Sequence, residues 1–99
     1  MSEFDKKEFS LFFLNCRRGM LELDVILLNF LDIRYYDLDL QFKKDFYDFL
    51  LESDNNLYSW LVKKKYTNTL KFYNVIEKII ITTNMFDFYW NDFHLLAFF

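Results

Sequence analysis

The chain has 99 residues, of which 54% are hydrophobic and 23% aromatic, and its formal net charge is −3. A chain of this length and hydrophobic content is expected to fold as one domain with a modest core, which argues against disorder. The acidic balance and the lack of a long basic run make a nucleic-acid-binding module a poor candidate. The longest apolar stretch, residues 25–31, is interrupted by Asn29 and is far too short to span a membrane.

The N-terminus and the cysteine content predict a cytoplasmic protein. Residues 1–5 are acidic and show neither an apolar signal core nor an Arg/Ser-rich transit pattern. The single cysteine, Cys16, has no partner for an internal disulfide. Both observations are typical of a protein in a reducing compartment.

Two helices are predicted in the first third of the chain. The first runs from about Phe4 to Arg17, with Ser2 as its N-cap, and its apolar face comprises Phe9, Phe12, Phe13 and Cys16. On that face Cys16 is expected to be a small buried hydrophobe and not a nucleophile. The second helix ends near Ile33, and its stripe comprises Leu23, Leu27, Phe30 and Leu31. Further apolar residues extend the apolar surface around nearly the whole circumference of this helix. The helix is therefore expected to lie at the centre of the bundle or to be partly covered by a partner.

Three more helices are predicted downstream. Asp39 is a good N-cap for the third, whose core face comprises Phe42, Phe46, Phe49 and Leu50. A polar cluster at residues 53–56 ends that helix and caps a short fourth one, whose inward residues are Leu57, Trp60 and Leu61. Lys63 to Lys65 then suit the negative end of the helix dipole; an acidic partner is possible, but a solvated helix end is favoured.

The fifth helix begins at about Thr67 to Asn68, and its apolar positions are Leu70, Tyr73, Val75, Ile76, Ile79 and Ile80. Residues 85–99 form an aromatic extension beyond the domain of residues 1–84. This extension is either a further helical stretch packed on the bundle through Phe86, Trp90, Phe93 and Ala97, or a sticky or membrane-facing end. The fold class predicted is all-α, a compact five-helix bundle in a single domain.

The stretch Arg17-Arg18-Gly19-Met20-Leu21-Glu22-Leu23-Asp24 contains the only glycine of a chain without proline. On the simplest interpretation, Gly19 breaks the helix, and the two arginines suit the C-terminal end of the first helix dipole. Glu22 and Asp24 would then lie in the opening turns of the second helix. Glu22 is also four residues from Arg18, a spacing that allows an ion pair.

This stretch, Cys16-Arg17-Arg18-Gly19-Met20-x-Glu22-x-Asp24, resembles the RGxxE-type motif of the succinate dehydrogenase assembly (flavinylation) factor family, the SdhE type. Downstream, Leu50-Leu51-Glu52-x-Asp54 and Leu57-x-x-Trp60-Leu61 resemble that family's third and fourth helices at nearly the expected spacing, so the likeness covers roughly residues 8–82. The chain departs from the family at Asn29, where members often carry proline, near Lys65, where they usually carry glycine, and in its aromatic tail.

The resemblance implies a chaperone that docks on the flavoprotein subunit of succinate dehydrogenase, and possibly of fumarate reductase, and promotes covalent attachment of FAD to a histidine there. The family's partner-binding residues map onto Arg17, Arg18, Gly19, Glu22 and Asp24. Family members have also been described as antitoxin-like partners of a membrane protein. A regulatory interaction module acting on a membrane or cytoskeletal partner is therefore the alternative, and the apolar tail fits it somewhat better.

No catalytic constellation is present in the sequence. It has no glycine-rich phosphate loop, no nucleophile beside a base and no Cys/His metal set, and its only histidine, His94, lacks neighbouring ligands. Glu22 and Asp24 are two residues apart, so on a helix they project in directions roughly 200° different. We therefore expect a protein that is not an enzyme, binds neither metal nor FAD tightly, and is a monomer when free.

Overall fold

A computed structural model describes residues 2–93 of the chain, with side chains described as far as Met85. Within these residues there are five α-helices, one short 3₁₀ helix and no strand, so the predicted all-α five-helix domain is confirmed. The elements are α1 (Glu3–Cys16), α2 (Leu21–Arg34), η1 (Tyr35–Asp37), α3 (Leu40–Leu50), α4 (Asp54–Leu61) and α5 (Leu70–Phe93).

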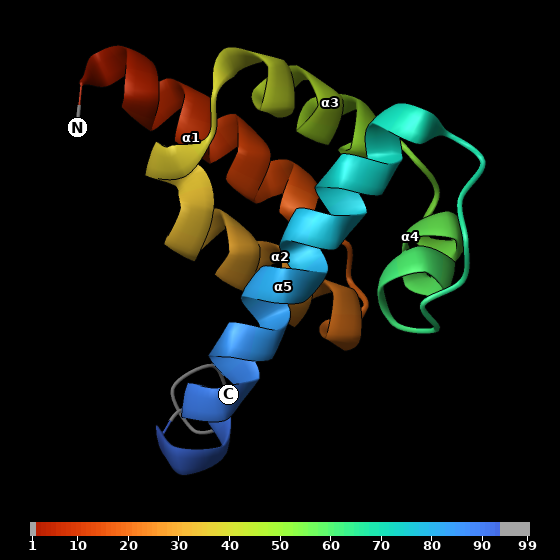
Figure 1. Cartoon of the computed structure of the whole chain (residues 1–99). Coiled ribbons are helices and arrows are strands. Elements are labelled where there is room, and N and C mark those ends of the chain that lie inside the picture. The colour runs from red at the N-terminus through yellow and green to blue at the C-terminus, as the bar shows by residue number, and fades with distance from the viewer. Residues whose placement is uncertain (1, 94–99) are drawn as a thin grey trace.

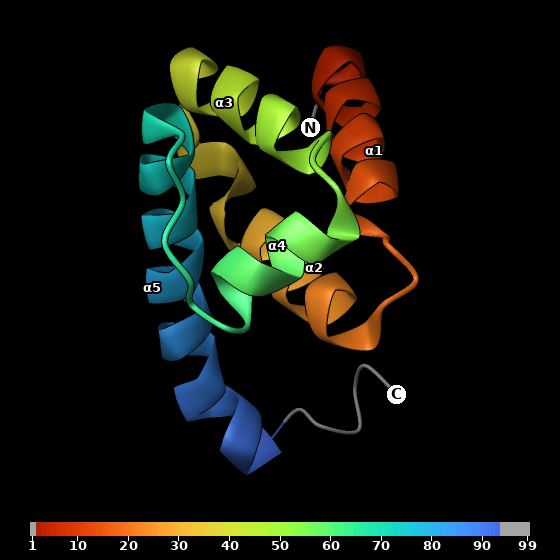
Figure 2. The same cartoon turned by 90° about the vertical axis from the view of Figure 1, so that its right-hand side faces the viewer.

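The bundle is organised around α2 and α5, which pack against each other and contact most of the other helices. In Figure 1, α5 crosses in front of α2, with α1 and α3 at one end of the molecule. Figure 2 shows that α4 lies in front of α2, between α5 on one side and the α1–α2 connection on the other. The α4–α5 connection runs beside α5, so it and the α1–α2 connection lie on opposite sides of α4.

The predicted faces of α2 and α3 form much of the core. All four stripe residues of α2 are buried, and on α3 Phe46, Phe49 and Leu50 are buried while Phe42 packs against them from the edge. The rings of Phe12 and Phe46 stack at 5.4 Å, and that of Phe30 meets Phe46 edge-on at 5.2 Å. This core is therefore largely aromatic, as the composition indicates.

Two predicted faces need correction. Phe13 of α1 is 38% exposed, because the α1 face that meets the bundle is centred on Phe12 and Cys16. On α5, Leu70 and Tyr73 are 84% and 50% exposed, whereas Val75 and Ile79 are buried as predicted. The helix starts at Leu70, not at residues 67–68, and its buried face comprises Phe72, Val75, Ile79 and Thr82, so Leu70 and Tyr73 lie outside that face.

Helix starts agree with the predicted caps. The Ser2 hydroxyl accepts from the Asp5 N–H at 3.0 Å, and the Asp39 carboxylate accepts from the Phe42 N–H at 2.7 Å. Ser53, in the predicted polar cluster, accepts from the Asn56 N–H at 3.1 Å and so caps α4. Each of these side chains satisfies a backbone donor that has no partner inside the helix.

The C-terminal extension is helical as far as Phe93, because α5 continues past Met85. Its predicted aromatic face stays a prediction, as does the division at residue 85, and His94 and Ala97 lie outside the described residues. None of the described helices combines the length and the apolarity needed to cross a membrane.

A polar contact connects α1, η1 and α3. The Glu8 carboxylate accepts from Lys43 Nζ at 2.6 Å and from the Tyr35 hydroxyl at 2.7 Å, and the Lys43 ammonium also lies 4.7 Å from the centre of the Tyr35 ring. Burial by itself would raise the pKa of Glu8, but the hydrogen bonds from Lys43 and Tyr35 outweigh it and lower that pKa below 4.5.

Because the pKa of Glu8 is lower in the folded state, its charged form stabilises the fold at neutral pH, and this contribution is lost as pH falls through the folded pKa. We expect Glu8→Gln to lower the free energy of unfolding by about 1 kcal/mol at neutral pH and to flatten its decline in acid. Urea titrations at a series of pH values measure the free energy of unfolding at neutral pH and its decline in acid. Glu3→Gln, at an exposed position, is the control, and identical acid profiles for the two variants would contradict the prediction.

The end of α4 uses a left-handed lysine in place of a glycine. Lys64 has φ +56°, the only positive φ of a non-glycine residue in the described chain. Such a conformation costs a side-chain-bearing residue about 1–2 kcal/mol, whereas glycine loses about 0.5–1 kcal/mol through chain entropy. We therefore expect Lys64→Gly to raise the free energy of unfolding by about 0.5–1 kcal/mol in urea denaturation. Lys65→Gly should lower the free energy of unfolding. Equal changes in this free energy for Lys64→Gly and Lys65→Gly would contradict the explanation from the backbone conformation.

Candidate functional site

The loop between α1 and α2 contains the predicted partner-binding stretch. Arg17 leaves α1 in an extended conformation, and Gly19 has φ +82°, in the left-handed region that favours glycine. A Cβ added at Gly19 would meet no atom within 4 Å. Glycine is thus needed here for the backbone turn, as predicted, and the space beside it is open.

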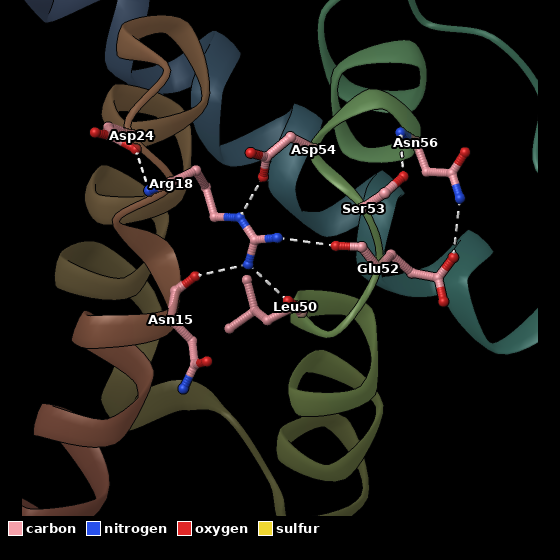
Figure 3. Close-up of polar contacts among 8 residues, drawn as sticks. All are labelled: Asn15, Arg18, Asp24, Leu50, Glu52, Ser53, Asp54 and Asn56. Atoms are coloured by element: carbon pink, nitrogen blue, oxygen red, sulfur yellow. Dashed lines mark hydrogen bonds and ion pairs between the residues drawn. The ribbon is translucent and has the colours of Figure 1, made fainter.

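The guanidinium of Arg18 lies inside the fold, with 17% of its side chain exposed. Nε donates to the Asp54 carboxylate at 2.7 Å, Nη1 donates to the carbonyls of Leu50 at 2.7 Å and Asn15 at 3.1 Å, and Nη2 donates to the Glu52 carbonyl at 2.9 Å (Figure 3). One side chain thereby connects the C-terminal ends of α1 and α3 with the first turn of α4.

The ion pair considered between Arg18 and Glu22 is wrong. Among the described residues the only carboxylate paired with Arg18 is that of Asp54. The spacing of four residues fails here because Gly19 interrupts the helix, so the two side chains are not on one helical face. Glu22 is exposed in the first turn of α2, where the sequence predicted it.

Asp24 has a structural contact of its own. Its carboxylate accepts from the backbone N–H of Arg18 and so fixes the loop against the start of α2 (Figure 3).

The five predicted partner-binding residues therefore divide into two groups. Arg18 and Asp24 are half-buried and bonded within the fold, whereas Arg17, Gly19 and Glu22 are exposed. Their assignment to a partner surface stays a prediction.

The partners of Arg18 were not foreseen, although the signal was present. The sequence Leu50-Leu51-Glu52-x-Asp54 was recognised as a helix landmark, and it supplies three of the four acceptors of Arg18. These contacts join residues 32 to 36 positions apart. The loop motif thus supplies the donor, Arg18, and the Leu50-Leu51-Glu52-x-Asp54 motif supplies most of its acceptors.

Cys16, next to this loop, is structural. Its thiol is fully buried, and burial raises its pKa to about 12, with the nearby Arg18 opposing and Asp24 reinforcing the shift. The predicted role as a small buried hydrophobe is confirmed. Among the described residues no three His, Cys, Asp or Glu side chains lie close enough together to hold a metal ion.

Comparison with known proteins identifies the family. Residues 12–82 match the family described as "Flavinator of succinate dehydrogenase". The chain belongs to this family. It is 40% identical over 79 residues to the FAD assembly factor SdhE of Francisella tularensis, covering 80% of this chain and 77% of that protein. The SdhE proteins of Photobacterium profundum and Coxiella burnetii are 35% and 38% identical over 69 and 64 residues, covering 70% and 65% of this chain and 78% of each relative.

No solved structure matches the chain. The family match includes the whole α1–α2 loop together with the α3 and α4 ends that bind Arg18. The resemblance inferred from the loop motif and the two downstream landmarks is thus confirmed for this flavinator family.

For this family member we expect Arg18→Ala to lower the free energy of unfolding by about 2–4 kcal/mol, because it leaves three carbonyls and the Asp54 carboxylate without their donor. Arg18→Lys should recover little of this loss, since an ammonium lacks the planar fork that serves several acceptors. Urea denaturation measures the free energy of unfolding of both variants. Arg17→Ala, at the adjacent exposed arginine, should stay within about 0.5 kcal/mol of wild type, and equal losses at the two arginines would contradict the assignment.

Proposed function

We propose that the chain is an FAD assembly factor that binds the flavoprotein subunit of succinate dehydrogenase and promotes covalent attachment of FAD to it. The observation that carries this proposal is the match of residues 12–82 to the flavinator family. Relatives that share 32–41% identity over much of the chain are named FAD assembly factors, which supports the same role.

The exposed part of the α1–α2 loop is the proposed docking surface. Arg17 and Glu22 carry opposite charges, and neither makes an ion pair with any side chain that the structure describes. A guanidinium offers a planar fork to carboxylates and carbonyls, and a glutamate pairs with a basic residue opposite. The open space beside Gly19 leaves room for the backbone of a partner.

Arg18 and Asp24 contribute to this surface indirectly. Their bonds fix the loop before any partner arrives. A surface ordered in advance loses less conformational entropy on binding, so more of the contact energy is available for affinity. We assign these two residues to positioning Arg17 and Glu22 for contact with the client.

The chemistry is proposed to belong to the client and to FAD, with FAD as the substrate of attachment. The only thiol of the chain is buried and has its pKa raised to about 12, so it is a poor nucleophile. We infer that the factor binds FAD weakly or not at all on its own. Its role would be to keep the client's domains in the arrangement in which flavin and histidine react.

Removing the exposed charges tests the proposal. We expect Glu22→Ala and Arg17→Ala to slow covalent flavinylation of the client subunit by at least about tenfold, because truncating a desolvated interface charge costs about 2–5 kcal/mol of binding. Their melting temperatures should stay near wild type, because both side chains are exposed. The measurement is in-gel fluorescence of covalent flavin on the client, with each variant at the same folded concentration.

Two matched controls are available. Asp32→Ala removes an exposed carboxylate from the same helix as Glu22, and Lys7→Ala removes an exposed cation from α1, the helix that Arg17 follows. Both should support wild-type flavinylation. Full activity from both loop variants would reject the docking surface. Recovery of a membrane protein, instead of a flavoprotein subunit, in pull-downs from the native host would favour the regulatory alternative.

A further inference from the structure

A pocket of about 300 Å³ lies between α5 and the connection that follows α4. Most of its lining residues come from α5 and the α4–α5 connection, which lie on the opposite side of α4 from the α1–α2 loop (Figure 2), and no residue of that loop lines it. The pocket is therefore separate from the proposed flavoprotein contact.

The lining of the pocket is aromatic and aliphatic. Trp60, Ile76 and Ile80 are its partly buried members, and the Trp60 ring is fixed by packing 5.7 Å from both Phe49 and Phe72. Tyr66 and Tyr73 line it from exposed positions, with their ring centres 6.4 Å apart. Two large exposed rings beside an apolar surface are typical of a binding site, because aromatic side chains bury much area at little entropic cost.

Two lysines also line this pocket. Lys64 and Lys65 make no ion pair with any described side chain, and Glu77 is the single carboxylate among the lining residues. The Lys65 N–H donates to the Ser59 carbonyl at 2.8 Å, so this segment is bonded to α4. In a chain with a net charge of −3, the pocket is a basic site. Lys63 to Lys65 are exposed, as the predicted solvated helix end requires, and the fold also places Lys64 and Lys65 beside an apolar pocket.

We propose that this pocket binds an extended acidic segment of a partner protein, with one aromatic side chain packed against the tyrosine pair and neighbouring carboxylates paired with Lys64 and Lys65. Charge complementarity selects the acidic segment, and the apolar lining selects the aromatic side chain. A nucleotide fits less well, because phosphate sites use glycine-rich backbone N–H groups and the only glycine of this chain is Gly19, in the other loop.

The two surfaces allow two partners at once. Because α4 separates the pocket from the α1–α2 loop, a segment in the pocket leaves the loop accessible. The chain would then act as a bridge between the protein bound at its loop and a second protein that carries the acidic segment.

The test uses the full chain and a fluorescent pentapeptide that has one phenylalanine flanked by two glutamates on each side. We expect saturable binding in anisotropy, weaker at higher salt, with amide NMR shifts centred on Tyr66, Tyr73 and Lys65. Tyr66→Ala should raise Kd by about fivefold or more, and Lys64→Gly by about two- to fivefold, the loss expected for one exposed ion pair. Lys64→Gly keeps the left-handed backbone and removes only the charged side chain.

The matched controls are variants outside the pocket. Lys63→Ala removes the adjacent lysine, which does not line it, and Tyr36→Ala removes a tyrosine that is 72% exposed elsewhere. Both should bind the peptide like wild type. The proposal is overturned if Lys63→Ala weakens binding as much as Lys64→Gly, if a peptide with alanine for phenylalanine binds equally well, or if no saturable binding occurs.

Two other occupants are also distinguishable. Dimers of the chain in sedimentation that Tyr66→Ala dissociates would show that a second copy fills the pocket, and this result would overturn the proposal. Displacement of the peptide by ADP at a lower concentration than by unlabelled peptide would assign the pocket to nucleotides and would equally reject it. Circular dichroism confirms that each variant is folded.

Discussion

The guanidinium of Arg18 is the contact on which the arrangement of α1, α3 and α4 depends. Helices leave their last carbonyls without intrahelical donors, and Arg18 supplies donors to Asn15 at the end of α1, to Leu50 at the end of α3 and to Glu52 in the turn that follows α3. The same group pairs with Asp54 in the first turn of α4. A cation at two helix C-terminal ends and a carboxylate at an N-terminal end each complement the local helix dipole. Hydrogen bonding and charge therefore favour the same arrangement of three helix ends.

This arrangement separates structural from surface residues within one short motif. Arg18 and Asp24 are bonded inward, whereas Arg17 and Glu22 are exposed around the left-handed Gly19. A loss of function on changing Arg18 would mix a weakened fold with an altered surface. The exposed charges are the cleaner probes, because nothing in the described core depends on them.

Interactions between residues close in sequence can be predicted from the sequence, whereas contacts between distant residues cannot. Caps such as Ser2 and Asp39 act within three residues, so a short window of sequence contains the whole interaction. Three of the four acceptors of the Arg18 side chain are 32 to 36 residues away, and only the folded chain brings them together. The predicted start of α5 is too early, because Thr67 resembles a helix N-cap in the sequence. Its hydroxyl instead accepts from the Thr69 N–H within the connection, and α5 begins at Leu70.

The scarcity of glycine connects the two candidate surfaces. A chain with one glycine has one inexpensive left-handed turn, and it is used at Gly19, between α1 and α2. The end of α4 must therefore adopt its left-handed conformation with Lys64. Where a glycine would leave no side chain, this terminus carries an ammonium group into the lining of the pocket beside α5. The residue that closes α4 thus also adds charge to the pocket, so the backbone turn that ends the helix and the proposed preference for an acidic ligand meet at one position.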